Sequence, residues 1–526
     1  MNNKYLSSLN PATLEEVGKV EATSSSQVNE IVKKAWSAFP KWRDMGLTKR
    51  TAILKKIQQQ LLSRSEEFAR LITIEMGKPI HESLGLEVHS CIDIIGYYVK
   101  NADTFLGERR VPLHHLLFIR RGSWLHCEPL GVLGVISPWN WPLLIPLNSI
   151  VPALLSGNAV VFKHSEWTPV LAEKMRNLFV ENGVPEDVFQ IIQGGAKQGK
   201  ALVESPVAKI FFTGSTRVGK IIYNSAAQQL KKCVLEMGGS DAAIVCNEAD
   251  VEYATSGILW GGFSNCGQNC NSIERVFVHQ NIFDDFLEIL VRKIKKVRIG
   301  SGEAEDSDIG PLASRQQFDK IKSIVEQSKK AGDTILTGGR PLKNKEGYFF
   351  QPTVILREAS CIQEDMEEVF GPVVYLTSVS DDDEAVRLAN KSKYGLAASV
   401  WTCQKKKGLQ IARRLLTGTV MINDAIVSFG MAEAGWTGAK QSGIGWVHGE
   451  KGLDEMVNIK YLNYEPQNRI QKFWWFPYSK EMVTTFWSAL QFLFSKSFVR
   501  KMANLLPVLK RISSYMLFNR RRSDKL

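Results

Sequence analysis

A cysteine in a small polar segment and a distant glutamate are the residues of this 526-residue chain best suited to covalent chemistry. Cys270 ends the stretch Gly267-Gln268-Asn269-Cys270, and Glu236 stands 34 positions earlier beside a pair of glycines. A cysteine thiolate is a strong nucleophile, and a carboxylate can take a proton from water so that a thioester is released. The pair predicts a covalent catalyst with a separate base. The alternatives are a small buried thiol and a capping or surface glutamate.

An asparagine between two tryptophans is a third candidate for chemistry. Asn140 lies in Ser137-Pro138-Trp139-Asn140-Trp141-Pro142, where prolines restrict the backbone on both sides. A side-chain N–H of asparagine can stabilise a developing oxyanion, and the two indoles can form an apolar slot. The alternative is a rigid turn with packed indole rings, which leaves Asn140 without a purpose.

Two further segments follow apolar runs in the manner of nucleotide-binding loops. Lys163 and Glu166 come directly after Ala159–Phe162, where a carboxylate can accept hydrogen bonds from ribose hydroxyls. The stretch 212–219 places glycines and hydroxyl side chains at a turn from a strand to a helix, which suits an anion. Neither segment is the usual GxGxxG fingerprint, and the alternatives are a solvated loop and a plain tight turn.

The elements that must position these residues alternate between strands and helices. From about residue 130, short apolar runs are separated by amphipathic helical stretches, which is typical of parallel sheets covered on both faces. The predicted strands are 132–136, 159–162, 210–212, 242–245, 275–278, 373–376 and 398–401, and the predicted helical stretches lie within 26–62 and at 283–296, 315–331 and 382–390. We therefore predict an α/β fold.

Composition and cysteine usage narrow the class of protein. The chain is 44% hydrophobic and 23% charged, which indicates a globular protein of two or three domains. Its eight cysteines are scattered without a CxxC motif, so we expect free thiols in a reducing compartment, and no zinc site because histidines at ligand spacing are missing. Met1–Tyr5 is not an apolar signal core, and no uncharged apolar run reaches 18 residues. We expect residues 1–466 to be cytoplasmic.

The positive charge is concentrated at the C-terminus. Of the net charge of +12, residues 467–526 contribute +10, so the sequence does not predict a nucleic-acid partner for the whole chain. This extension begins with the aromatic cluster 473–478, continues with apolar residues at helical spacing from Phe486 to Phe494, and ends near Arg520–Arg522. Aromatic and basic residues together suit an anionic membrane surface. The alternative is a pair of helices that pack on the enzyme's own body or across a dimer.

The motifs together resemble the aldehyde dehydrogenase superfamily over about residues 10–464. The segments that carry the resemblance are SPWNWP (137–142), GNAVVFKHSE (157–166), FTGSTRVG (212–219), LEMGGSD (235–241), GQNC (267–270), ERVFV (274–278) and EEVFGP (367–372). The resemblance implies two doubly wound parallel α/β domains, a small β oligomerisation element and, here, a helical extension. The implied boundaries are 1–110 and 130–236 for the cofactor-binding domain, 237–447 for the catalytic domain, 111–129 and 448–466 for the oligomerisation element, and 467–526 for the extension.

The resemblance also implies roles for individual residues. Cys270 would be the nucleophile, Glu236 the general base and Asn140 the oxyanion stabiliser in the oxidation of an aldehyde to a carboxylic acid. The implied cofactor contacts are Trp139, Lys163, Glu166, Gly195, Gly214, Ser215, Gly219, Glu368 and Phe370. The implied cofactor is NAD, with NADP as the alternative, and no metal is implied. A homodimer or homotetramer is expected. The competing functions are a CoA-acylating dehydrogenase and a catalytically silent scaffold at a membrane.

At two places that bear on the substrate, this sequence departs from the pattern of the family it resembles. Semialdehyde-specific members of the family have an arginine eight positions after the oxyanion asparagine, where this chain has Asn148. Together with Trp141, Leu144 and Ile145, this predicts an apolar or aromatic aldehyde. The Pro-Phe-Gly-Gly stretch that is usual in the family is replaced here by Ser428–Trp436. In the family this region helps to close the substrate tunnel, so the sequence does not predict the shape of the tunnel in this chain.

Overall fold

The computed structural model describes residues 4–114, 118, 121–343, 345–364, 366–465 and 475–523, with side chains described up to residue 510. The chain divides into two compact units. The first unit comprises Met1–Gly107 and Cys127–Ile459, and the second comprises Glu108–His126 and Lys460–Leu526. The predicted aromatic residues Phe473 and Trp474 lie outside the described residues, as do the side chains of Arg520–Arg522.

A six-stranded sheet forms one half of the first unit. In spatial order its strands are β19 (Gly443–Ile444), β9 (Lys232–Glu236), β8 (Lys209–Thr213), β5 (Val132–Ile136), β6 (Ala159–Lys163) and β7 (Phe189–Ile192). Strands β9 to β7 pair in parallel, and only the short β19 is antiparallel to its neighbour among the described strands.

A seven-stranded sheet forms the other half. Its strands in order are β12 (Thr334–Thr337), β13 (Thr353–Leu356), β14 (Val373–Val379), β11 (Ile273–His279), β10 (Asp241–Val245), β16 (Ala397–Trp401) and β17 (Thr419–Ile422). Again the strands pair in parallel except at one edge, where β12 is antiparallel to β13. Two short antiparallel pairs lie outside these sheets, β1 (Tyr5–Leu9) with β2 (Glu16–Glu21) and β15 (Tyr394–Gly395) with β18 (Ala439–Lys440). The predicted α/β class is confirmed.

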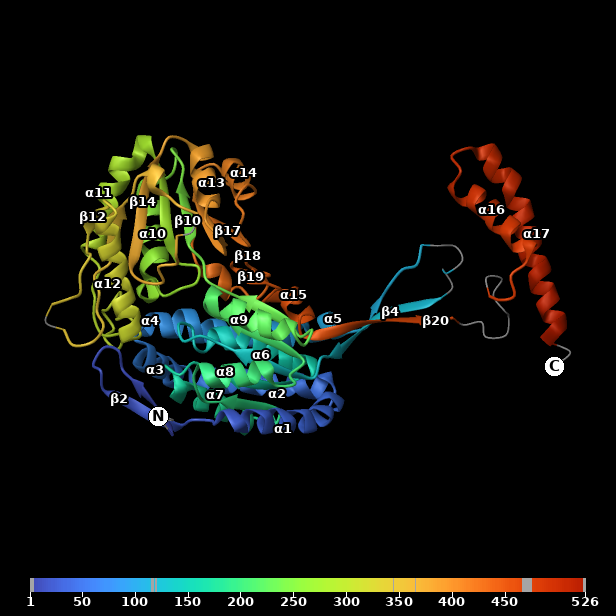
Figure 1. Ribbon diagram of the computed structural model, residues 1–526, viewed down its shortest axis with the longest axis horizontal. Coiled ribbons are helices and arrows are strands. Elements are labelled where there is room, and N and C mark those ends of the chain that lie inside the picture. Colours follow the sequence, from blue (N-terminus) through green and yellow to red (C-terminus); the bar gives the residue numbers. More distant parts are fainter. Residues whose placement is uncertain are drawn as a thin grey trace. The chain divides into compact units, whose positions relative to one another are not determined.

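Helices cover both sheets (Figure 1). Those of the first half are α1 (Ser25–Asp44), α2 (Leu47–Ser63), α3 (Ser65–Met76), α4 (Ile80–Glu82), the π-helix η1 (Ser83–Val88), α5 (His89–Leu106), α6 (Leu144–Ser156), α7 (Pro169–Glu181), α8 (Ala196–Glu204), α9 (Thr216–Ala227) and α15 (Gly449–Asp454). Those of the second half are α10 (Val251–Phe263), η2 (Ser264–Gly267), η3 (Gln280–Ile282), α11 (Phe283–Ile294), α12 (Arg315–Lys330), η4 (Ala359–Cys361), α13 (Asp382–Asn390), α14 (Lys405–Ala412) and η5 (Val427–Gly430).

Strand β10 explains why the second sheet is covered on both faces. Ala243 and Val245 belong to an apolar core that also contains residues of α10, α11 and α12. Ala242 and Ile244 belong to a separate core with residues of α13 and α14. Side chains alternate between the faces of a strand, and the four residues after Asp241 in β10 are all apolar and buried, so this run faces a core on both sides.

The two sheets present opposite edges to the site. Glu236 ends β9, and the turns after β5 and β8 carry Asn140 and Gly214 at the carboxyl edge of the first sheet. Cys270 and Glu368 precede β11 and β14 at the amino edge of the second sheet. Because the chain order reverses between β5 and β8, their carboxyl ends form the switch point where open α/β sheets bind ligands.

The second unit is described by itself. It contains most of a three-stranded sheet in the order β20 (Val457–Tyr464), β4 (Gly122–Pro129) and β3 (Arg109–Arg110), and the helices α16 (Lys480–Phe494) and α17 (Phe498–Ser523). Residues 457–459 of β20 and 127–129 of β4 belong to the first unit. Residues 115–117, 119–120 and 466–474 of the predicted oligomerisation element and extension lie outside the described part. Across the described residues, the helices fall short of the length and apolar character that a membrane span requires.

Candidate active site

Cys270 lies where two cavities of the first unit meet. A cavity of about 250 Å³ (the first cavity) and one of about 170 Å³ (the second cavity) both include Cys270 in their lining. Burial, and after it the charges of Glu236, Asp241 and Glu368, raises the pKa of the Cys270 thiol well above its usual range. The resting side chain is therefore a neutral thiol that must lose its proton before it can act as a nucleophile.

Glu236 lines the second cavity together with Cys270. Its carboxyl group is buried, and this burial raises its pKa to about 8. The indole Nε1 of Trp436 donates a hydrogen bond to Oε1 at 3.0 Å, which acts in the opposite direction and lowers the pKa. Oε2 has no hydrogen-bond partner among the described residues. Glu236 can therefore act as a base near neutral pH, with one oxygen held and the other available.

Asn140 reaches the same cavity from the turn after β5. Its buried side chain donates from Nδ2 to the carbonyl oxygen of Gln268 at 3.0 Å. An amide NH₂ carries two N–H bonds, so one remains for an oxyanion at Cys270. The sequence placed Cys270, Glu236 and Asn140 far apart, and the structure brings all three to one cavity.

The loops of Asn140 and Cys270 are hydrogen-bonded to each other. Asn265 donates from Nδ2 to the backbone carbonyls of Asn140 at 3.1 Å and Gln268 at 3.3 Å. Trp141 donates from Nε1 to Oδ1 of Asn269 at 2.8 Å. Asn265 has φ +51°, in the left-handed region that asparagine tolerates better than most residues. These contacts hold the loops of Cys270 and Asn140 in one arrangement.

A third cavity of about 570 Å³ continues from the second along the carboxyl edge of the first sheet. The two share Pro138, Trp139, Thr213, Gly214 and Ser215 in their linings. Lys163 and Glu166 also line the third cavity, where Lys163 Nζ lies 3.1 Å from Glu166 Oε2. This pair presents a cation and a carboxylate to the third cavity, groups that are able to bind ribose hydroxyls.

Glycines and the start of α9 lie along the third cavity, where they would suit a diphosphate. Gly195 lines the third cavity next to Glu166, and a Cβ on Gly195 would lie 3.4 Å from Oε1 of that carboxylate, at ordinary contact distance. Helix α9 begins beside the cavity, capped by Ser215, whose hydroxyl accepts from Val218 N. First-turn N–H groups and the helix dipole favour an anion there. Gly219 does not line these cavities; a Cβ there would collide with the Met237 sulfur.

Glu368 and Phe370 close the second cavity on the side of the second sheet. Glu368 accepts a hydrogen bond from Gly239 N at 3.1 Å, and burial raises its pKa to about 8. Phe370 has φ +54° and lies edge-on to Trp139, with ring centroids 5.6 Å apart. The Glu274 carboxylate accepts from the backbone N–H of Phe370 at 2.9 Å, which holds this strained residue. The donor set and the glycine-lined shape fit a dinucleotide across the second and third cavities.

The first cavity has a different lining. It is mostly apolar and aromatic, and its members are Gly85, Leu86, His89, Ser90, Asp93, Trp141, Leu144, Ile145, Trp260, Asn269, Cys270, Asn271, Ile426, Val427, Phe429, Gly430 and Met431. Lysine and arginine are missing from this lining within the described part of the chain. Trp141, Leu144 and Ile145 are in place as predicted. Asn148 is absent from this lining, and its Nδ2 donates a hydrogen bond to the Leu144 carbonyl inside α6.

Three residues of the site were not predicted from the sequence. Trp436 binds the predicted base, Asn265 joins the loops of Asn140 and Cys270, and Glu274 holds Phe370. A signal existed for Trp436, because it ends the stretch that departs from the family pattern. Glu274 begins the ERVFV motif, but a single sequence does not tell which backbone groups a carboxylate meets.

Comparisons with known proteins agree with this geometry. The profile of the aldehyde dehydrogenase family matches residues 1–462. A mitochondrial succinate-semialdehyde dehydrogenase of Arabidopsis thaliana is 34% identical over 474 residues, 89% of this chain and 88% of the relative. A chloroplastic betaine aldehyde dehydrogenase of Atriplex hortensis is 34% identical over 463 residues, 86% and 92% of the two chains.

Solved structures show the same likeness. The NAD+ complex of an aldehyde dehydrogenase from Bacillus cereus superposes with a TM-score of 0.83 at 34% identity, covering 88% of this chain and 94% of the other. A structure described as an NADP-dependent enzyme of E. coli gives a TM-score of 0.83 at 29% identity, covering 88% and 95%.

Proposed function

The chain belongs to the aldehyde dehydrogenase family, and on this premise we propose that Cys270, Glu236 and Asn140 carry the oxidation of an aldehyde to a carboxylic acid. It is an oxidoreductase that uses NAD or NADP. The observation that carries the assignment is the convergence of the three side chains on the second cavity. Each residue supplies a different part of the reaction.

The cofactor would lie across the second and third cavities. Lys163 and Glu166 would hold the adenosine ribose, and Gly195, Gly214 and Ser215 would leave space and N–H groups for the diphosphate. Trp139, Glu368 and Phe370 would enclose the nicotinamide half. Gly219 lies within α9 and would serve by letting that helix pack closely against Met237. The carboxylate of Glu166 favours NAD, because it would repel a 2′-phosphate. When bound, the nicotinamide supplies the acceptor for the hydride that leaves the aldehyde carbon.

Cys270 would form the covalent bond to the substrate. An aldehyde that enters through the first cavity meets the Sγ atom at the junction of the cavities. The thiol would first give up its proton to solvent water. As the resulting thiolate forms the C–S bond, the C=O π bond opens and the carbonyl oxygen takes the negative charge, which the free N–H of Asn140 and the backbone N–H of Cys270 would bind. Asn140 is pre-positioned by its bond to Gln268, so little reorganisation is needed.

Glu236 would complete the reaction by hydrolysis. After hydride loss the carbon is a thioester of Cys270, and Oε2 of Glu236 would take a proton from a water that attacks it. The C–S bond then breaks, the sulfur leaves as a thiolate, and a carboxylic acid is released. A base with a pKa of about 8 is suited to gain and lose this proton near neutrality.

Product analysis of the purified protein tests the assignment. With an aldehyde and NAD, but without CoA, we expect equal amounts of reduced cofactor and free carboxylic acid. A requirement for CoA and the appearance of an acyl-CoA would overturn hydrolysis in favour of the acylating branch. Absence of cofactor reduction with a broad aldehyde panel, in a protein that binds NAD, would favour the silent scaffold.

We propose an uncharged aldehyde with an apolar or aromatic body as the substrate. The first cavity is lined by Trp141, Trp260 and Phe429 and by aliphatic side chains. Its acidic member, Asp93, is exposed and would repel a substrate carboxylate. This chain is therefore proposed to differ from its succinate-semialdehyde relative in substrate class.

We propose self-association through the small sheet of the second unit. Strand β20 lies at an edge of this sheet and exposes Tyr461 and Tyr464, which are 52% and 59% accessible. An exposed edge strand with large side chains is a template for pairing with a second copy. Light scattering should give a dimer or tetramer; a monomer at micromolar concentration would contradict it.

We propose that the helices α16 and α17 bind an anionic membrane surface. Trp487, Phe494 and Phe498 are 62%, 70% and 74% accessible, and exposed Lys496 and Arg500 lie among them. Such a combination inserts apolar side chains while the cations meet lipid headgroups. Sedimentation with anionic but not neutral vesicles would support this, provided that a variant ending at Pro466 stays in solution. No sedimentation would favour the alternative, helices that pack on the enzyme.

We propose a reducing compartment, the cytoplasm, as the location. All eight cysteines of the chain are free thiols, including the exposed Cys361 and Cys403. Fractionation of cells tests the compartment, and a disulfide in the isolated protein would contradict it.

A further inference from the structure

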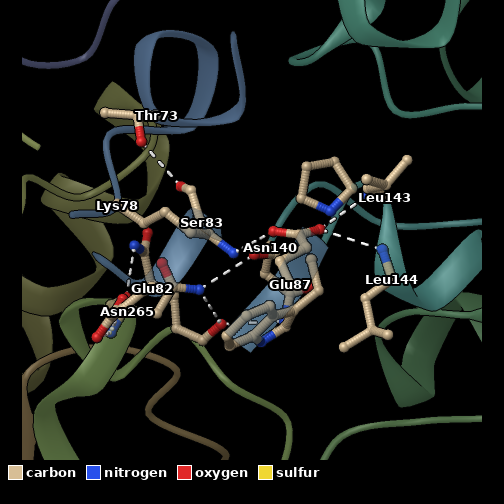
Figure 2. Close-up of polar contacts among 12 residues, drawn as sticks. Thr73, Lys78, Glu82, Ser83, Glu87, Asn140, Leu143, Leu144 and Asn265 are labelled. Atoms are coloured by element: carbon tan, nitrogen blue, oxygen red, sulfur yellow. Dashed lines mark hydrogen bonds and ion pairs between the residues drawn. The ribbon is translucent and has the colours of Figure 1, made fainter. Parts of the chain in front are cut away.

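A short segment behind the active site carries three buried charged residues. Lys78, Glu82 and Glu87 lie between α3 and α5, and the side chains of Lys78 and Glu87 are 0% exposed. Lys78 Nζ lies 2.7 Å from Glu87 Oε2 (Figure 2). The three do not appear in the lining of the cavities, so they are not in position to touch substrate or cofactor.

Glu87 holds the turn that carries Asn140. Its Oε1 accepts hydrogen bonds from the backbone N–H of Leu143 at 2.7 Å and of Leu144 at 3.2 Å. These groups stand at the start of α6, three and four residues after Asn140. Figure 2 shows this carboxylate between the two N–H groups on one side and Lys78 on the other.

Glu82 holds the loop that carries Cys270. Both of its oxygens accept from the backbone N–H of Asn265, at 3.0 and 2.9 Å. Asn265 and Cys266 have φ +51° and +57°, so this loop adopts a conformation that needs support from its surroundings. Asn265 in turn donates to the backbone of Asn140, and thus joins the two loops.

Lys78 links Glu87 to an aromatic ring that bridges the two loops. Its Nζ lies 3.5 Å from the ring centroid of Trp141, the residue after Asn140. That indole donates to Asn269, the residue before Cys270. A single ammonium group therefore contacts the carboxylate below one catalytic loop and the aromatic ring that bridges to the other.

The π-helix η1 explains how one segment can serve two loops. Glu82 and Glu87 are five positions apart. In an α-helix such residues point about 140° away from each other. In η1 the backbone N–H of His89 bonds to the carbonyl of Leu84, five residues back, and this wider turn brings residues five apart toward one face.

Stability alone gives little reason for these charges, because a buried ion pair is often no better than apolar residues of the same size. We propose that Glu82 and Glu87, with Lys78 between them, are positioning residues that set the placement of Cys270 relative to Asn140. The proposal builds on the proposed roles of Cys270 and Asn140. It follows that Glu82 affects the placement of Cys270, and Glu87 the placement of Asn140.

Glu75 provides a matched control. It is also buried, at 1% exposure, and it also accepts two backbone N–H groups at a helix start, from Val170 at 3.1 Å and Leu171 at 2.8 Å. It supports α7 and makes no hydrogen bond, among those described, to either catalytic loop. Glu75→Gln therefore reports the cost of altering such a carboxylate without moving the catalytic residues.

The experiment compares Glu75→Gln, Glu82→Gln and Glu87→Gln in the full-length enzyme. Thermal midpoint, kcat, KM and the rate of Cys270 alkylation by iodoacetamide are measured for each. All three should lower the thermal midpoint. Glu82→Gln should also slow alkylation and lower kcat, and Glu87→Gln should lower kcat while alkylation stays near wild type. Displacements of about 1 Å cost about 10²-fold in rate, whereas Glu75→Gln should keep kcat within about twofold.

Equal kcat in all three folded variants would overturn the proposal. If a glutamine variant fails to fold, Glu82→Asp and Glu87→Asp replace it, because they keep the negative charge and shorten the side chain by one methylene. Both aspartate variants should fold. An unchanged kcat in both would also overturn the proposal. The double variant K78M/E87Q, which removes both buried charges, should regain thermal stability over Glu87→Gln without regaining kcat. Wild-type turnover that survives Cys270→Ala would instead refute the proposed function, so the two failures are distinguishable.

Discussion

The two cavities that share Cys270 differ in what surrounds the same sulfur atom. The second cavity has Glu236 and Glu368, both with a pKa raised to about 8, and the amide of Asn140. The first cavity is lined mainly by aromatic and aliphatic side chains. Groups that are able to move protons and to bind an oxyanion therefore lie on one side of the sulfur, and mainly apolar side chains lie on the other. Variants in the second cavity should change kcat, and those in the first should change the choice of substrate.

Removing the shared sulfur should have the largest effect. Cys270→Ala is expected to lower kcat/KM by at least about 10⁴-fold, because the covalent route is lost. Cofactor reduction measures the loss, and fluorescence titration should show that NAD still binds. The control is Cys403→Ser, an exposed thiol, which should keep full activity. Comparable turnover in both variants would show that the cavities do not meet at a nucleophile.

Loss of the base should stall the second half of the reaction. Glu236→Gln is expected to lower steady-state turnover by about 10²–10⁴-fold while one equivalent of reduced cofactor still appears in a rapid burst. Rapid mixing with absorbance detection measures the burst, and mass spectrometry should find the acyl group on Cys270. A slow phase without a burst would place Glu236 before hydride loss rather than after it.

Asn140→Ala should show a smaller loss of about 10²–10³-fold in kcat, because one oxyanion donor disappears. The reaction with an aldehyde should suffer more than alkylation by iodoacetamide, which forms no oxyanion. Equal losses in the two assays would mean that Asn140 acts only through its bond to Gln268 and the placement of Cys270.

Trp436 should tune the base through pH. The pKa of Glu236 is raised to about 8 by burial, and the bond from Trp436 lowers it. Since the deprotonated form is the active base, turnover should rise with pH through about 8. Trp436→Phe removes the bond, so the pKa should rise further and the midpoint of the kcat profile should move to higher pH. An unchanged or lower midpoint would contradict this role, whatever the change in maximal rate.

Asp93 should have the smallest effect, and only on selectivity. Asp93→Asn removes a negative charge from the first cavity and should raise kcat/KM for an anionic aldehyde about two- to fivefold, as expected for an exposed charge. Succinate semialdehyde and uncharged pentanal are suitable probes, and kcat for pentanal should not change. A wild-type preference for succinate semialdehyde over pentanal would contradict the proposed substrate class.

Much of the fold could be predicted because it is local. The predicted strands at 132–136, 242–245 and 275–278 correspond to β5, β10 and β11, since strands buried on both faces leave continuous apolar runs in the sequence. The capping box of α1 is equally local, with Ser24 accepting from Gln27 N and Gln27 Oε1 accepting from Ser24 N. The π-helix η1 was not predicted, because its one-residue difference from an α-helix depends on tertiary contacts.

The candidate site was predictable as a set of residue types, and not as a set of contacts. The Trp436 indole meets Glu236 across 200 positions, and Glu82 meets Asn265 across 183. Nothing at either position alone reveals its partner. Asn148 shows a local contact instead. In semialdehyde-specific members of the family this position faces the substrate tunnel, but here the Asn148 side chain donates a hydrogen bond to Leu144 within α6.

By itself, the sequence determined the order of strands and helices and the presence of a thiol, a carboxylate and an amide at particular loops. Those features follow from local propensity, hydrophobic period and chemistry, which a linear pattern contains. Only the tertiary structure decided that the three lie in one cavity, that burial raises the pKa of Glu236, and that charges behind the site hold its loops. Burial and long-range hydrogen bonds arise only after the chain has closed on itself, so they have no signature in a single segment.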